Sequence, residues 1–387
     1  MPTPDKKTRR RTNTAWQRAL SAQQTRLIRV RRGNNNNNNN KKSADSGPGD
    51  GGAASDHPLH TYMVLEHGFE DPAYSVLELA AGAVPRSLLH VSAGTSFAAV
   101  PTRRGPRIVG VGLVYPKLHP VLIPHGGGRL YALTRTPSVV QGRDFVPWFL
   151  VADFSTGAVV DGGTVGSRWR QLPPPPVFPC RLNPLEYRDP PKVRVESYAV
   201  VGARILLSVR SDVPEGTETE ARRYEGTCAF DVDAKQWEMV DHENLPFVGQ
   251  AVHLGGRRFV ARSRTKGGGA AAVYDMDVLP PGNTSSGKTE LSIVELEVVS
   301  KGIVPGQLLC SMAKDSFASF DVRWLDPSPE TKWDRARIVH RTYSVVSMDD
   351  AGTNSVVVVK QHRHIFKVRG QYTRLARPSP VVAALSM

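Results

Sequence analysis

The sequence predicts an all-β fold, and two observations support this prediction. From about residue 60 onward the chain repeats short apolar runs in which every second residue falls on the same face of a strand. The chain also contains 34 glycines and 30 prolines, which interrupt it too often for long helices. Many strands of similar size without alternating helices are typical of a sandwich, a barrel or a propeller.

The expected strands are identified by apolar residues that recur at alternate positions. Four triplets each define one apolar face: Ile205, Leu207 and Val209; Cys228, Phe230 and Val232; Tyr274, Met276 and Val278; and Val294, Leu296 and Val298. Two further apolar runs, 356–359 and 365–368, follow near the end of the chain. We interpret all six segments as strands.

Internal repetition selects among the all-β architectures. A glycine turn leads into an apolar strand at 127–131, 201–205 and 255–259, and two copies continue to an Asp and then a Trp. This order is typical of a kelch blade, in which glycines form tight turns and the Trp packs between blades. The blade positions are Trp169, Gly202, Asp231, Trp237, Gly255 and Gly256. At about 50 residues per blade, residues 58–387 predict a kelch-like β-propeller of roughly six blades.

Four motifs between residues 169 and 249 carry a family resemblance. They are Trp169 to Pro176, Val195 to Gly202, Gly226 to Asp231 followed by Trp237, and Leu245 to Gly249. In this order they resemble an uncharacterised kelch-like family of grasses. The chain departs from that pattern by an insertion at 212–225 and by an arginine-rich strand at 257–266. The resemblance implies a propeller domain of unknown function and assigns no catalytic residues.

The net charge of +14 is concentrated at the N-terminal end. Residues 1–42 hold twelve Lys and Arg residues against Asp5 alone, so they carry +11 and residues 43–387 carry +3. We expect a basic arm over 1–33 that is weakly helical around 14–32. The Asn run and the Ser-, Gly- and Ala-rich stretch at 34–57 predict a disordered linker.

The basic arm has a candidate function of its own. A flexible cationic segment binds polyanions by releasing their counterions and reads no base sequence. The candidate polyanion-binding residues are Lys6, Lys7, Arg9, Arg10, Arg11, Arg29, Arg31 and Arg32. The same arm also fits a nuclear signal, an organelle presequence or an unselected extension, and the sequence leaves these alternatives open.

The segment 282–289 matches the phosphate-binding pattern G-x-x-x-x-G-K-[ST] through Gly282, Gly287, Lys288 and Thr289. A working phosphate loop follows a parallel strand and opens a helix, whose N-terminus contributes its dipole. Here the residues that follow, 291–299, alternate like a strand. We therefore interpret the segment as a loop between strands.

Other candidate sites lack one of the groups that their chemistry needs. The segment 125–128, His-Gly-Gly-Gly, resembles an oxyanion-hole segment, but the chain contains no G-x-S-x-G nucleophile motif. His362 and His364 share one strand face without a recognisable third metal ligand. Cys180, Cys228 and Cys310 are expected to be core residues. We therefore expect no catalytic residues, no metal site and no cofactor.

Two basic segments, 257–266 and 360–374, place Phe259, Phe366 and Tyr372 among positive charges. Aromatic rings beside Arg and Lys suit single-stranded nucleic acid. Charged residues on an exposed edge strand, which prevent sheets from associating, produce the same pattern. We favour the edge-strand interpretation for both segments.

These observations lead us to expect a non-enzymatic interaction module. It should be a monomer that binds an unknown protein partner through propeller loops. The first alternative is non-specific nucleic-acid association through the arm, and the second is a nucleotide-binding enzyme that uses 282–289. No apolar stretch is long enough for a membrane helix and no secretory signal is evident, so we expect an intracellular protein of the nucleus or cytoplasm with no membrane contact.

Overall fold

The computed structural model describes strands and turns between residues 24 and 386. The described residues are 24–28, 61–67, 73–79, 86–92, 95–100, 107–112, 120–137, 148–155, 164–165, 169–178, 188, 192–211, 225–266, 270–284, 287–298, 308–324, 335–347, 355–369 and 381–386. They form 24 strands in four hydrogen-bonded sheets, whose neighbouring strands are mostly antiparallel. The all-β prediction is therefore confirmed.

The strands fall into six antiparallel groups of four. Group 1 contains β24 (Val381–Ser386), β2 (Thr61–His67), β3 (Ala73–Leu79) and β4 (Arg86–Ser92). Group 2 contains β5 (Thr95–Val100), β6 (Arg107–Gly112), β1 (Gln24–Ile28) and β10 (Thr164–Val165). Group 3 contains β7 (Val121–His125), β8 (Arg129–Leu133), β9 (Phe149–Asp153) and β11 (Arg170–Leu172).

The other three groups together form the 12-stranded sheet. Group 4 contains β12 (Val193–Val201), β13 (Arg204–Ser211), β14 (Thr227–Asp231) and β15 (Gln236–Asp241). Group 5 contains β16 (Phe247–Gly255), β17 (Arg258–Ser263), β18 (Ala271–Leu279) and β19 (Glu290–Val298). Group 6 contains β20 (Leu308–Ala313), β21 (Ser316–Trp324), β22 (Arg335–Ser347) and β23 (Ser355–Arg369).

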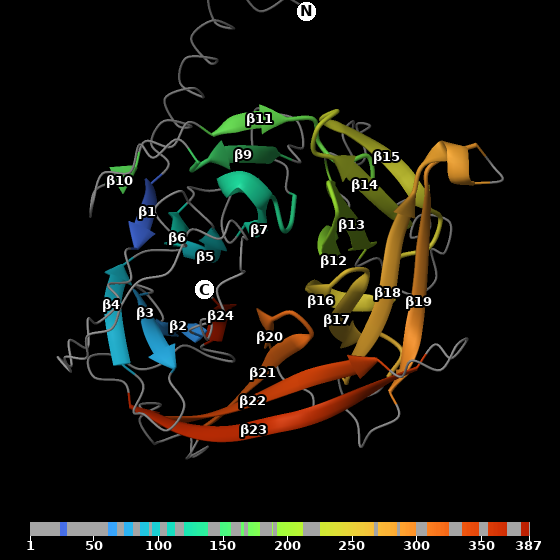
Figure 1. Ribbon diagram of the computed structural model, residues 1–387. Helices are drawn as coiled ribbons and strands as arrows, with labels where there is room; N and C mark the ends of the chain where they lie inside the picture. Colours follow the sequence, from blue (N-terminus) through green and yellow to red (C-terminus); the bar gives the residue numbers. More distant parts are fainter. Residues whose placement is uncertain are drawn as a thin grey trace, which may run out of the picture.

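The six groups are arranged in a ring. Figure 1 shows them around a common centre, with the first strand of each group nearest to that centre. Short parallel pairings join groups 4, 5 and 6. Strand β12 pairs with β16 at Ser197 and Tyr198, and β19 pairs with β23 at Glu297 and Val298. The long strands β22 and β23 lie along the outer side of the ring (Figure 1).

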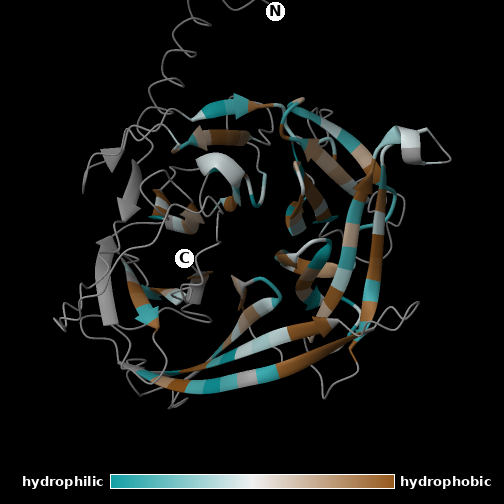
Figure 2. Ribbon diagram, in the orientation of Figure 1, coloured by the Kyte–Doolittle hydropathy of each residue, from teal (hydrophilic) through white to brown (hydrophobic). Residues whose placement is uncertain are grey.

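A hydrophobic core fills each of the six junctions between neighbouring groups. Strand β8 shows how this is achieved, because Leu130 and Ala132 pack into the core shared with group 2, whereas Tyr131 and Leu133 pack into the core shared with group 4. The middle strands thus bury both faces, and Figure 2 shows many of their residues in the brown of apolar side chains. This explains why their sequences contain continuous apolar runs.

The expected apolar faces are largely observed. Two of the four triplets, the one that begins at Ile205 and the one that begins at Cys228, lie in the core between groups 3 and 4. Tyr274 and Met276 lie in the core between groups 4 and 5, with Val278 packed against it. Leu296 and Val298 contribute to the core between groups 5 and 6, whereas Val294 is 41 % exposed.

The glycines of the repeated turn are required by the backbone. Gly202 connects β12 to β13 and Gly256 connects β16 to β17, each with a φ of +56°. Residues with a side chain rarely adopt this conformation. At Gly255 a Cβ atom would lie 3.2 Å from Cγ of Lys314, so the turns of groups 5 and 6 approach closely there.

One segment of the basic arm differs from expectation. Residues 24–28 form strand β1, which pairs antiparallel with β6 from Gln24↔Gly112 to Ile28↔Ile108. The expected weak helix over 14–32 is therefore wrong for these residues. A short helix is marginal in isolation, whereas β6 offers a complete row of hydrogen-bonding groups on its open edge.

The last strand closes the ring on the first described group. Strand β24 pairs antiparallel with β2, from Thr61↔Ser386 to Val64↔Ala383. Its side chains serve two junctions, because Ala383 and Leu385 pack against the core between groups 1 and 2, while Ala384 packs against the core between groups 6 and 1. The C-terminal strand therefore links group 1 to both of its neighbours.

Removing this strand should destabilise the whole ring. We expect deletion of residues 381–387 to lower the midpoint of thermal unfolding by at least about 5 °C, because several kcal/mol of packing are lost and each kcal/mol shifts the midpoint by about 1–2 °C in a chain of 387 residues. Differential scanning calorimetry of this variant, with deletion of Met387 alone as the control, measures the effect. Equal midpoints for the two deletions would contradict the role given to β24.

Candidate interaction surfaces

Trp237 of β15 joins groups 3 and 4. Its ring centroid lies 5.3 Å from that of Phe149 on β9 and 5.1 Å from that of Phe230 on β14. Its indole Nε1 donates a hydrogen bond to the carbonyl oxygen of Pro173 at 2.9 Å. Trp169, which precedes β11, packs against the core between groups 2 and 3. Both residues therefore lie at junctions, where they contribute packing.

Asp231 organises the turn between β14 and β15. Its Oδ1 accepts hydrogen bonds from the backbone N–H groups of Asp233 at 2.9 Å and Ala234 at 2.8 Å. Its Oδ2 lies 3.5 Å from the guanidinium of Arg204, at the start of β13. These contacts give Asp231 a structural role at the end of its strand.

The phosphate-loop match, residues 282–289, lies between the antiparallel strands β18 and β19. The hydroxyl of Thr284 donates to the carbonyl oxygen of Lys288 at 2.6 Å, Gly287 has a φ of +65°, and the Thr289 side chain is buried. Strand β19 begins at Glu290, directly after the match. Phosphate loops direct the N-terminus of a helix at the phosphate, whereas the residues described directly after this match form strand β19.

The His-Gly-Gly-Gly segment forms the connection between β7 and β8. Gly126–Gly128 make a single 3₁₀ turn, η1, and the ring Nε2 of His125 lies 3.3 Å from the carbonyl oxygen of Gly202. The turns of groups 3 and 4 therefore contact each other here. This placement gives the segment a structural role.

The first basic segment, 257–266, is neutralised by carboxylates from other strands. Four of its five cations form ion pairs: Arg257 with Asp275 and Asp277, Arg258 with Asp315, Arg264 with Glu196, and Lys266 with Glu295. The Arg258–Asp315 distance of 2.5 Å joins groups 5 and 6. Carboxylates of the protein therefore neutralise most of the positive charge of this segment, so less of it can attract a polyanion.

The second basic segment behaves differently. Lys360, Arg363 and Lys367 of β23 are exposed, and β22 adds Arg337 and Arg341 beside them. Within the described residues, none of these five cations forms an ion pair with a carboxylate. From Val357 onward, the described residues offer β23 no second partner strand beside β22. The second segment is therefore a candidate surface for an anionic partner.

His362 and His364 share one face of β23, and the structure brings His340 of β22 directly opposite His364. The ring centroids lie 6.1 Å apart for His362 and His364 and 6.4 Å apart for His340 and His364. His340 is 7 % exposed and stacks on Phe320 at 4.8 Å. Burial, together with the nearby His364, lowers the pKa of His340 to about 4. Among the described residues, no cluster of three or more His, Cys, Asp or Glu side chains is arranged to hold a metal ion.

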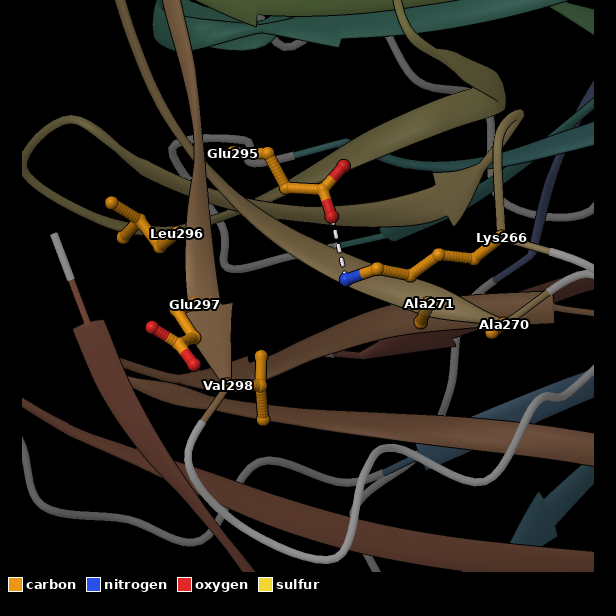
Figure 3. Close-up of a pocket in the computed structure, with 7 residues that line it drawn as sticks. All are labelled: Lys266, Ala270, Ala271, Glu295, Leu296, Glu297 and Val298. Carbon is orange, nitrogen blue, oxygen red and sulfur yellow. Dashed lines mark ion pairs between the residues drawn. The ribbon is translucent and has the colours of Figure 1, made fainter.

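A pocket of about 480 Å³ lies at the outer side of the junction between groups 5 and 6. Its apolar lining comes from Ala270, Ala271, Leu296 and Val298, and its charged lining from Lys266, Glu295 and Glu297. Figure 3 shows Lys266 and Glu295 pointing toward each other. The Nζ atom of Lys266 lies 2.5 Å from Oε1 of Glu295. The sequence did not reveal this pocket, because its residues come from the β17–β18 connection, the start of β18 and the end of β19, which meet only in the folded chain.

The cysteines lie in the cores where the structure describes them. Cys228 and Cys310 are buried and unpaired, and burial raises the pKa of both thiols, to about 12 for Cys310. Thiols of this kind are poor nucleophiles and poor metal ligands at neutral pH. Cys180 lies outside the described residues.

The expected polyanion-binding residues of the arm, from Lys6 to Arg32, lie outside the described residues, and so does the expected linker at 34–57. Both therefore stay predictions. In the part of the chain that the structure describes, no helix is long and apolar enough to cross a membrane.

The packing of Trp237 yields a stability prediction. We expect Trp237→Ala to lower the free energy of unfolding by about 3 kcal/mol, because a large ring leaves a junction core. Trp237→Phe should cost only about 1 kcal/mol, since it keeps an aromatic ring and loses the hydrogen bond to Pro173. Urea denaturation measures both values. Equal losses in the two variants would show that the ring itself contributes little.

The buried imidazole of His340 yields a pH prediction. The folded chain holds it neutral down to about pH 4, whereas an unfolded imidazole takes up its proton near pH 6.5. The unfolded state therefore binds more protons in this interval, so stability present above pH 6.5 is lost as the pH falls toward 4. His340→Phe should remove about 2 kcal/mol of the loss between pH 7 and pH 5, measured by urea denaturation at both pH values. The same loss in the parent and the variant would contradict the assignment.

Comparison with known proteins places the chain in a family. The family model described as a protein of unknown function, DUF1668, matches residues 79–366, a range that includes all four motifs between residues 169 and 249. No curated protein matches the chain. The chain belongs to the DUF1668 family of proteins of unknown function.

Proposed function

We propose that the protein is a non-enzymatic interaction module built as a six-bladed kelch-like propeller. Each group of four strands corresponds to one blade of this architecture. Three features support the proposal: a core at every junction, glycine turns between the inner strands of groups 4 and 5, and a first blade completed by the C-terminal strand. A ring held together in this way is a rigid scaffold that can present a binding surface.

The proposed partner is a protein that binds at the outer side of the junction between groups 5 and 6. The observation that carries this proposal is the pocket of about 480 Å³, in which apolar side chains lie beside the charged pair Lys266 and Glu295. Protein interfaces commonly centre on a pocket that receives one apolar or aromatic anchor, with polar groups around it. The pocket matches this pattern and has room for at least one large side chain.

In the proposed complex, an apolar side chain of the partner enters the pocket and covers Ala270 and Leu296. Lys266 and Glu297 remain at the edge, where they contact polar groups of the partner. Burial of apolar surface provides the affinity, and the charged edge sets the orientation.

A pocket-filling substitution tests the proposed function. A photo-crosslinking amino acid at Lys266 first identifies contacting proteins, and calorimetry then measures the affinity of each purified protein for the full chain. We expect Ala270→Trp to weaken the affinity at least about tenfold, because the new ring occupies the pocket. Ala203→Trp, an equal change in the exposed β12–β13 turn, should leave the affinity within about twofold.

The opposite results would reject the proposal. A partner whose affinity is unaffected by Ala270→Trp does not use this pocket. Displacement of the partner only by small metabolites would instead assign the pocket to a small ligand, whose sites have a comparable volume.

A further inference from the structure

The two outer strands of group 6 form the most basic described element of the protein. Strands β22 and β23 span 28 residues and contain no Asp or Glu. Their seven cations are Arg335, Arg337, Arg341, Lys360, Arg363, Lys367 and Arg369. Residues 43–387 together carry a net charge of only +3, so this cluster is a local excess within a nearly neutral domain.

The register places like charges directly opposite each other. Arg341 pairs with Arg363, and Arg337 pairs with Lys367, so all four cations lie on one face with Ile365 between them. The neighbouring strand β21 adds one carboxylate to this face, Asp321, which lies opposite Val339. Side chains opposite each other in an antiparallel pair have Cβ atoms about 5 Å apart, and like charges in these positions destabilise the pair. The opposite face carries His340, His364 and Phe366, which pack toward group 1.

Arg341 has a second unfavourable feature. Its residue is 6 % exposed, and its Nη1 has no hydrogen-bond partner in the protein. A buried cation without an ion-pair partner is costly, and an anion bound over the exposed Arg337, Arg363 and Lys367 would lower this cost electrostatically without touching Arg341. By contrast, the partly buried Arg204 and Arg258 each have a carboxylate partner.

We propose that this face, formed by Arg337, Arg341, Arg363 and Lys367, binds the phosphate backbone of a nucleic acid. Residues four apart on one strand are separated by about 13 Å, and the two strands by about 5 Å, so the cations form two parallel rows. A nucleic acid presents a negative charge at every nucleotide, and it can therefore meet both rows in any sequence register. An acidic peptide would need carboxylates at four fixed positions to achieve the same neutralisation.

Contacts to phosphates fix position without reading bases, so we expect little sequence preference. This surface is distinct from the pocket between groups 5 and 6, and its binding does not require the protein partner proposed above.

The salt dependence of binding tests this inference on the full chain. The probe is a 20-base-pair DNA duplex, titrated between 50 and 200 mM salt by fluorescence anisotropy. We expect Arg363→Gln with Lys367→Gln to reduce the slope of log K against log salt by about 2, from about 0.9 per lost phosphate contact. The matched control, Arg170→Gln with Lys192→Gln, removes the same charge from exposed positions of other strands and should leave the slope unchanged.

A variant of the buried cation separates binding from folding. We expect Arg341→Met to weaken DNA binding about fivefold or more at 50 mM salt and, at the same time, to raise the midpoint of thermal unfolding. A purely structural role for Arg341 would instead lower the midpoint and leave the affinity of the folded protein unchanged.

Three results would overturn the inference. The first is an identical slope in the parent, the double variant and the control, which would place DNA binding elsewhere in the chain. The second is displacement of DNA by polyglutamate at a lower concentration of charge, which would indicate an acidic peptide. The third is stronger binding to anionic lipid vesicles than to DNA, abolished by the double variant, which would indicate a membrane surface.

Discussion

Burial of apolar side chains between neighbouring sheets is the constraint on which the rest of the structure depends. Each group has four strands and two apolar faces, so a group alone would expose both faces to water. Only a closed ring covers every face, which explains why β24 returns to β2 across more than 300 residues of sequence. The tight turns at Gly202 and Gly256 follow from the same constraint, because they keep the inner strands adjacent.

Electrostatics separate the basic residues of the ring into two classes. Between groups 4, 5 and 6, cations such as Arg258 and Arg264 meet carboxylates of neighbouring strands and join the groups. On β22 and β23 the cations face each other, and Arg341 is buried without such a partner. Surface ion pairs contribute little to stability, but a buried unpaired charge is expensive. The cations of β22 and β23 are therefore the ones for which we propose a binding function, whereas the ion-paired cations between groups 4, 5 and 6 contribute to the fold.

Local patterns in the sequence predicted the features that are themselves local. Alternation identified the face of Ile205 and Leu207, and the glycine pattern identified the turns at Gly202 and Gly256. Non-local contacts could not be derived in this way. The residues of strand β1 were expected to be helical, because local spacing cannot reveal their partner β6, which lies 80 or more residues further along the chain. The two basic segments look alike in sequence, and only the distant carboxylates, such as Glu196 beside Arg264, distinguish them.

The two proposed surfaces lie at opposite ends of one rigid element. The Ser347 and Ser355 end of β22 and β23 adjoins the pocket, and the Arg337 and Lys367 pair lies near the other end. The part of β22 from Arg341 to Ser347 spans about 20 Å, more than twice the Debye length of about 8 Å at physiological salt. Phosphates at the basic end therefore have little electrostatic effect at the pocket. A protein partner and a nucleic acid could bind simultaneously, held at a distance set by the strands.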